Sequence, residues 1–220
     1  IIGTLAWTQN MLTTPIPSGW KYIAMFLSIS LIVPFGLIFY NLISHVSRSD
    51  FHMQAPLRFA MGALSLASIG LLACLKTGEH ALIVDTVYDP VRDFADRVLT
   101  TLGIEVEYYD PLIGAGIARL LRKNTRAVYC ESPGSMTLEI QDLPAIAKAA
   151  HAAGASVLAD NTWGTPLLYK PLRLGADIVV HSATKYIGGH SDLMLGLLVA
   201  NDSLVRKVKQ TAGLFGQTAG

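Results

Sequence analysis

This sequence has few cysteines and almost no net charge. Only two cysteines occur in 220 residues, and neither Cys74 nor Cys130 lies in a CxxC pair or at metal-ligand spacing from a histidine. This pattern excludes a recognisable zinc motif and a disulfide framework, and isolated cysteines suit a reducing compartment, so we expect a cytoplasmic protein without a metal site. The formal net charge is only +1, which gives no reason to expect nucleic acid as a partner.

Charged residues are also rare in one long stretch near the start of the chain. Residues 20–43 are almost wholly apolar and are long enough to cross a bilayer, which needs roughly 20 such residues. This run predicts a membrane-associated segment, with a buried helix of a soluble core as the alternative. A second apolar stretch, residues 57–75, is rich in alanine, glycine and serine, and its second half predicts a buried helix in a soluble protein.

The rest of the chain has the alternating pattern of an α/β protein. Short apolar runs bounded by turn residues predict strands, and segments with helical spacing between them predict helices. In residues 90–102 the spacing places Phe94, Val98 and Leu102 on one face. This order predicts βαβ units and a mainly parallel sheet with flanking helices. The expected strands are 81–85, 104–109, 126–130, 156–160 and 178–181, and the expected helices are 90–102, 116–122 and 143–153.

A lysine follows the last of these strands within the sequence SATKY, residues 182–186. Ser182 and Thr184 flank Lys185 with hydroxyl groups that can donate to a phosphate, and Gly188 and Gly189 allow the backbone to approach a ligand closely. A confined, partly desolvated amine at this place would have a lowered pKa and would be nucleophilic. A surface lysine in a turn is the alternative.

An acid ends the strand expected at residues 156–160. Ligands of parallel sheets bind outside the carboxyl ends of the strands, and both Asp160 and Ser182 lie at such ends. A carboxylate at this place can pair with a protonated pyridine nitrogen and keep the ring charged, as pyridoxal 5'-phosphate (PLP) chemistry requires. The alternative is an aspartate that caps a turn or helix. Asp160 and Lys185 together, each after a strand, favour a PLP site.

From about residue 71 to residue 220 the chain resembles the large domain of the cystathionine β-lyases, which belong to the Cys/Met-metabolism group of fold-type I PLP enzymes. The tryptophan at position 163, after Asp-Asn-Thr, favours the β-lyase branch. The similar stretches are 76–80 (KTGEH), 87–90 (VYDP), 109–116 (YDPLIGAG), 131–137 (ESPGSMT), 142–147 (DLPAIA), 160–163 (DNTW) and 182–192 (SATKYIGGHSD).

The resemblance implies a role for each matching residue. Lys185 would form the Schiff base with PLP and move the α-proton, and Asp160 would be the partner of the pyridine nitrogen. Tyr88 would stack on the cofactor ring and act as an acid or base. Ser182 and Thr184 would lie on the phosphate side. The family also holds the phosphate on backbone amides at the start of a helix, and the nearest equivalents here are Gly62 and Ala63, one position out of register.

The activity that the resemblance implies is cleavage of cystathionine, a sulfur amino acid, to homocysteine, pyruvate and ammonia. The γ-lyases and γ-synthases of the same group are the alternative, and an inactive fused or truncated remnant is a third possibility. The family also implies a homo-oligomer, a tetramer built from dimers. Its C-terminal domain supplies an arginine for the substrate carboxylate, and we expect that domain to be absent, which leaves the PLP-binding large domain incomplete.

A different resemblance concerns the start of the chain. Residues 3–70 weakly resemble subunit I of haem–copper oxidases, and Gln9-Asn10 stands where that family has two histidine copper ligands. This resemblance therefore implies no metal site. We expect two parts: an apolar helical segment over residues 1–50, membrane-type or fused, and the PLP-binding domain over residues 51–220.

Overall fold

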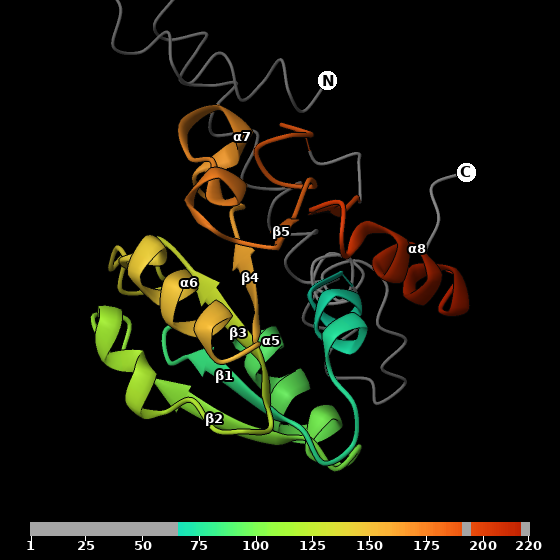
Figure 1. Cartoon of the computed structure of the whole chain (residues 1–220). Coiled ribbons are helices and arrows are strands. Elements are labelled where there is room, and N and C mark those ends of the chain that lie inside the picture. The colour runs from blue at the N-terminus through green and yellow to red at the C-terminus, as the bar shows by residue number, and fades with distance from the viewer. Residues whose placement is uncertain (1–65, 191–194, 217–220) are drawn as a thin grey trace, which may run out of the picture. The chain divides into compact units, whose positions relative to one another are not determined.

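The computed structural model describes residues 66–190 and 195–216. The chain divides into two units, residues 1–53 and residues 54–220, and the described residues all belong to the second. In that part of the chain six strands form one sheet, flanked by helices (Figure 1). This is the mainly parallel α/β arrangement that the alternation of apolar runs predicts.

The order of the strands in the sheet is β2-β1-β3-β4-β5-β6, and every neighbouring pair is parallel except β5 with β6. The strands are β1 (His80–Val84), β2 (Glu105–Tyr109), β3 (Thr125–Glu131), β4 (Ser156–Asp160), β5 (Ile178–His181) and β6 (Leu197–Ala200). The helical elements with defined bounds are α5 (Asp89–Phe94), the π-helix η2 (Ala95–Leu99), the 3-10 helix η3 (Gly114–Arg119), α6 (Leu143–Ala152), α7 (Thr165–Leu168), the 3-10 helix η4 (Pro171–Leu174) and α8 (Val205–Leu214).

The central strands are buried on both faces. All five residues of β1 and all four of β5 are buried, because helices cover both sides of a parallel sheet. The helix α6 lies over β3 and β4 (Figure 1). It begins at Asp142, whose side chain accepts a hydrogen bond from the Ala145 backbone N–H. The five strands expected from the sequence are all present, each within one residue at either end.

Residues 66–74 are helical and bury one face in the core, which confirms the buried helix expected in the second half of residues 57–75. A Cβ atom at Gly70 would lie 3.0 Å from Leu158 and 3.8 Å from Ile178, so the glycine lets this helix approach the sheet closely. None of the helices in the described ranges is long and apolar enough to span a bilayer. The apolar run 20–43 lies outside the described residues.

The expected helix over residues 90–102 is correct in place but wrong in its buried face. The buried residues are Val91, Ala95 and Leu99, whereas Val98 is 41% exposed and Leu102 44% exposed. The buried set and the predicted set are both spaced by four residues, so the helical period alone does not choose between the two faces. The α-helix α5 continues from Ala95 as the π-helix η2. The expected helix at 116–122 is instead the 3-10 helix η3.

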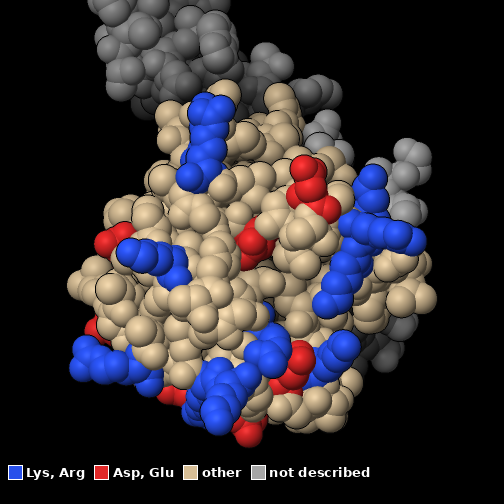
Figure 2. Space-filling model, viewed as in Figure 1, with Lys and Arg blue, Asp and Glu red and all other residues tan. Residues whose placement is uncertain are grey.

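Strand β6 and helix α8 were not expected from the sequence. The sequence of β6, LLVA, is an apolar run like those of the predicted strands, but its side chains alternate between exposed and half-buried at the edge of the sheet. Helix α8 buries only Val208, and basic residues occupy much of its surface. Figure 2 shows Lys and Arg side chains scattered over the visible face with Asp and Glu among them.

Both cysteines of the chain are buried and reduced. Burial raises the pKa of the Cys74 thiol to about 11 and that of the Cys130 thiol to about 12. Cys74 lies at the end of the helix over residues 66–74, and Cys130 lies in β3 at the centre of the sheet. The two thiols are therefore core side chains, in line with the absence of a metal motif around them.

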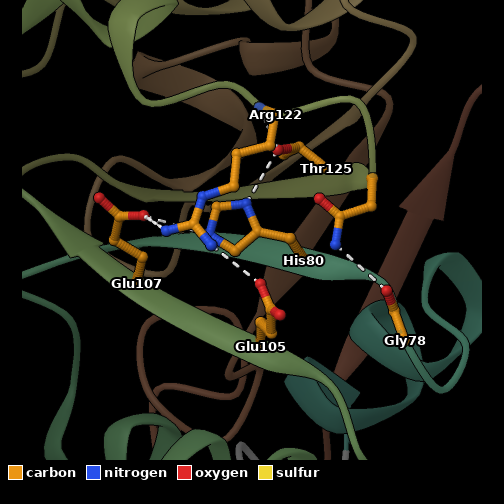
Figure 3. Close-up of polar contacts among 7 residues, drawn as sticks. Gly78, His80, Glu105, Glu107, Arg122 and Thr125 are labelled. Atoms are coloured by element: carbon orange, nitrogen blue, oxygen red, sulfur yellow. Dashed lines mark hydrogen bonds and ion pairs between the residues drawn. The ribbon is translucent and has the colours of Figure 1, made fainter.

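A buried histidine forms a polar cluster at the amino end of the sheet (Figure 3). His80 is 0% exposed, and its Nδ1 atom lies 2.8 Å from the Thr125 hydroxyl, which also accepts the Arg122 backbone N–H at 2.7 Å. The Arg122 guanidinium bridges Glu105, at 2.8 Å, and Glu107. The second ring nitrogen, Nε2, lies 3.4 Å from a Glu107 carboxylate oxygen. Burial lowers the pKa of His80, and the charge of Arg122 lowers it further.

The cluster predicts a loss of stability at acidic pH. The folded chain binds a proton at His80 less readily than the unfolded chain, so the free energy of unfolding should fall as the pH drops below 6.5, the ordinary pKa of histidine. The contribution of one proton is at most about 1.4 kcal/mol per pH unit. Urea unfolding from pH 5 to pH 8 should show a shallower pH dependence for His80→Gln than for the wild type. The control is His190→Gln, at an exposed position, and equal slopes for all three chains would contradict the prediction.

Candidate active site

The carboxyl ends of four strands meet at one cavity. β1 leads to Tyr88, β3 ends at Glu131, β4 ends at Asp160, and β5 is followed by Ser182. Parallel strands place these ends on one edge of the sheet, which is where ligands of such sheets bind. The cavity has a volume of about 120 Å³ and is lined by Tyr88, Glu131, Pro133, Ser135, Asp160, Thr162, Trp163, Ser182, Lys185 and Tyr186.

The loop after β5 presents Lys185 to this cavity. The Lys185 backbone N–H donates to the Ser182 carbonyl at 3.0 Å, and the Gly189 N–H donates to the Lys185 carbonyl at 2.8 Å, with Gly189 at a φ of +68°. The ammonium nitrogen lies 4.8 Å from the centre of the Tyr88 ring. Lys185 is an exposed residue that lines the cavity, so this structure does not show the confined amine expected from the sequence.

Asp160 is fixed by the turn that follows it. Its Oδ1 atom accepts the Thr162 backbone N–H at 2.9 Å, and the Thr162 hydroxyl accepts the Ser182 N–H at 2.8 Å. Thr162 thereby joins the ends of β4 and β5, which carry the acid and the lysine loop. Burial raises the pKa of Asp160, although hydrogen bonds from Thr162 and the charge of Lys185 oppose that shift.

A second carboxyl group, that of Glu131, lies beside Asp160 and was not among the site residues predicted from the sequence. Glu131 and Asp160 are partners in the β3–β4 register, and a Glu131 oxygen accepts the Tyr88 backbone N–H at 2.9 Å. Burial and then the charge of Asp160 raise the pKa of Glu131 to about 8. The same rule that pointed to Asp160, a polar residue at the carboxyl end of a buried strand, could have found Glu131.

The remaining predicted site residues are not all brought to the cavity. Ser182 is buried and lines it. The Thr184 hydroxyl instead donates to the Leu195 carbonyl at 3.1 Å and accepts the Leu195 N–H at 3.0 Å, so it braces the base of the loop and does not line the cavity. Gly62 and Ala63 lie outside the described residues.

Comparison with known proteins agrees with this geometry. Residues 52–220 match the family described as Cys/Met metabolism PLP-dependent enzyme. The chain belongs to this family. Its cofactor is therefore PLP, as the pairing of Asp160 with Lys185 predicts. The match does not support the resemblance of residues 3–70 to haem–copper oxidases, because it begins at residue 52 and so takes in residues 52–70 of that range.

Relatives of several named activities are similar to the same part of the chain. The chain is 41% identical over 161 residues to the cystathionine β-lyase MetC of Escherichia coli, covering 72% of this chain and 40% of that protein. It is 42% identical over 150 residues to an L-methionine γ-lyase of Fusobacterium nucleatum, covering 68% of this chain and 37% of the relative. A solved cystathionine γ-lyase from Lactobacillus plantarum, complexed with L-serine, superposes with a TM-score of 0.69 at 32% identity, covering 72% and 42%.

The chain thus spans about two fifths of the length of the curated relatives it matches. Whether PLP fits the cavity can be judged from the described residues that line it. Two neighbouring carboxyl groups, Asp160 and Glu131, have raised pKa values, and Lys185 is the one Lys or Arg among the residues lining the cavity. The protonated pyridine nitrogen of PLP would supply a positive charge beside the buried Asp160 carboxyl group and would favour its ionised form. The donor set therefore fits the cofactor of the family.

Proposed function

We propose that this chain carries the cofactor-binding core of a carbon–sulfur β-lyase that converts cystathionine and water to homocysteine, pyruvate and ammonia. The convergence of Lys185, Tyr88 and Asp160 on one cavity at the carboxyl edge of the sheet carries the proposal. Membership of a PLP-dependent family and the 41% identity to the E. coli cystathionine β-lyase support it.

Each residue has a task that follows from its atoms. Lys185 Nζ would hold PLP covalently and then take the proton from the substrate α-carbon. The Asp160 carboxylate would accept a hydrogen bond from the pyridine nitrogen and keep that nitrogen protonated. The Tyr88 ring, already beside the lysine amine, would stack on the cofactor, with its hydroxyl as an acid or base. When bound, PLP supplies the electron sink for the electron pair released at the α-carbon.

The phosphate group of the cofactor would lie on the side of Ser182. The hydroxyl of Ser182, which is buried and lines the cavity, would donate to the phosphate. Gly62 and Ala63 would add backbone N–H groups, as the family resemblance implies. Thr184 would act on this side only indirectly, because its hydroxyl is engaged with Leu195.

The second candidate is a γ-lyase or γ-synthase reaction on a related sulfur amino acid. The relatives of F. nucleatum and L. plantarum, both named γ-lyases, favour it. Further proposals rest on the family: assembly into a homo-oligomer, a cytoplasmic location, and a division into residues 1–50 and a PLP-binding domain over residues 51–220. A chain that binds PLP without turnover is the third candidate.

The test is the identity of the keto acid released. The purified chain, loaded with PLP, should turn yellow and release pyruvate from cystathionine, measured by coupling to lactate dehydrogenase and by chromatography. Release of 2-oxobutyrate would overturn the β-lyase proposal in favour of the γ-lyase. A yellow protein that releases no keto acid would be a PLP-binding module, and a colourless one would refute cofactor binding by this chain.

A further inference from the structure

The carboxyl group of Glu131 has no part in the proposed chemistry, yet it is built into the cavity. It ends β3 directly beside Asp160, is 9% exposed, and accepts the Tyr88 backbone N–H at 2.9 Å. We propose that Glu131 is a positioning residue of the PLP cavity: it holds the backbone of Tyr88 and so fixes the tyrosine ring in front of Lys185. This inference rests on the proposed binding of PLP in this cavity.

The position of Tyr88 at the start of α5 has to be fixed by a contact from outside that helix. It is the N-cap residue of α5, and its side chain makes no capping hydrogen bond, so its own residue does not fix the entry to the helix. The Tyr88 carbonyl already accepts the Val91 N–H at 2.9 Å. The contact from the Tyr88 N–H to Glu131 therefore ties the start of α5 to the end of β3, 43 residues away in sequence.

A neighbouring contact strengthens this tie. The Ser135 N–H donates to the Thr86 carbonyl at 2.9 Å. A Cβ atom at Gly134 would lie 2.6 Å from the Thr86 hydroxyl, so the two segments touch and leave no room for a larger residue. Glu131 thus completes a junction between residues 86–88 and 131–135. Its removal would leave the Tyr88 N–H without an acceptor, which is costly for a shielded donor.

The surroundings of Glu131 indicate whether its side chain accepts the Tyr88 N–H as the neutral acid or as the carboxylate. Burial and then the charge of Asp160 favour the neutral acid, and the pKa of about 8 keeps it protonated at neutral pH, while the Tyr88 N–H, Lys185 and the Ser135 hydroxyl favour ionisation to a lesser degree. A neutral carboxyl group still accepts a hydrogen bond through its carbonyl oxygen. Glutamine has the same length and the same acceptor, so it should replace Glu131 closely.

The proposal is tested by PLP affinity across a set of variants of the full chain. Titration of the apo chain, followed by absorbance, gives the dissociation constant of PLP. Glu131→Gln should stay near the wild type. Glu131→Leu, which lacks the acceptor, and Glu131→Asn, which is too short to reach the Tyr88 N–H, should each weaken PLP binding about tenfold, the equivalent of one hydrogen bond.

A double-mutant cycle separates positioning from general support of the fold. If Glu131 acts through Tyr88, Glu131→Leu should weaken PLP binding little further in a Tyr88→Ala background. Thr125→Val is the matched control: Thr125 begins the same strand, and its hydroxyl also accepts a backbone N–H, from Arg122 at 2.7 Å. This variant should lower stability in urea without changing PLP affinity.

Hydrogen exchange of the Tyr88 amide in the apo chain gives a readout that does not depend on PLP. The amide should be protected in the wild type and in Glu131→Gln, and should exchange faster in Glu131→Asn. The proposal would be overturned if the effects of Glu131→Leu and Tyr88→Ala on PLP affinity multiplied fully. It would also be overturned if Glu131→Gln bound PLP as weakly as Glu131→Leu does. If the wild type binds no PLP, the proposed function fails, and the exchange data alone still decide whether Glu131 holds Tyr88.

Discussion

Replacing Lys185 with alanine is expected to abolish covalent attachment of PLP to this chain. The amine of Lys185 lies 4.8 Å from the centre of the Tyr88 ring, and among the described residues no other lysine lines the cavity. Borohydride reduction of the PLP-loaded wild type, followed by mass spectrometry of its peptides, should find the cofactor fixed on Lys185. The same treatment of Lys185→Ala should leave no modified peptide.

Lys170→Ala is the control for this experiment. Lys170 also lies in a loop of the domain, but it lines a different cavity, beside Arg173 and His181. The variant should keep both the yellow colour and the modified Lys185 peptide. Cofactor trapped on Lys76 or Lys170 in the wild-type chain would show that the assignment of Lys185 is wrong.

Replacing Asp160 with asparagine should leave the fold intact and severely impair the chemistry. A neutral amide cannot hold the proton on the pyridine nitrogen, and the ring then becomes a poor electron sink. We expect a rate of keto-acid release about a thousandfold lower, equivalent to about 4 kcal/mol of transition-state stabilisation. The asparagine carbonyl can still accept the Thr162 N–H, so the turn after β4 should persist.

The matched control uses the same local motif outside the cavity. Asp110 follows β2 at the exposed edge of the sheet, and its Oδ1 atom accepts the Leu112 N–H at 2.8 Å, as Asp160 does with Thr162. Asp110→Asn should turn over at the wild-type rate. The measurement is steady-state release of keto acid at saturating PLP, and undiminished turnover by Asp160→Asn would refute the assigned role.

The parallel core of this fold is predictable from its sequence because its strands are buried on both faces. Such strands appear as short continuous apolar runs between turn residues, and β4 and β5 are found at their observed bounds. The edge strand β6, LLVA, is also a short apolar run but was not predicted, and its side chains alternate between exposed and half-buried. The buried face of α5 and η2 was misjudged because two apolar sets, each spaced by four residues, occur along this segment and the period does not choose between them.

The residues of the cavity were predictable to different degrees. Asp160 and Ser182 follow from the rule that polar residues at strand ends face the ligand edge of a parallel sheet. Tyr88 has no such signal, because its place beside Lys185 arises from contacts almost a hundred positions apart, and only the family resemblance pointed to it. Glu131 satisfied the rule, but the Ser132-Pro133 sequence after it reads as a simple turn, and its link to Tyr88 appears only in three dimensions.

The rate at which a reagent modifies each of the two buried cysteines would report on local opening of the domain. A thiol reagent attacks the thiolate, and both thiols are shielded and kept protonated in the folded state, so alkylation requires a local or global opening event. Cys130 would report on separation of the central strands next to the cavity, and Cys74 on release of the helix over residues 66–74. The difference between their labelling rates would therefore show which part of the domain opens first, without the introduction of a further residue.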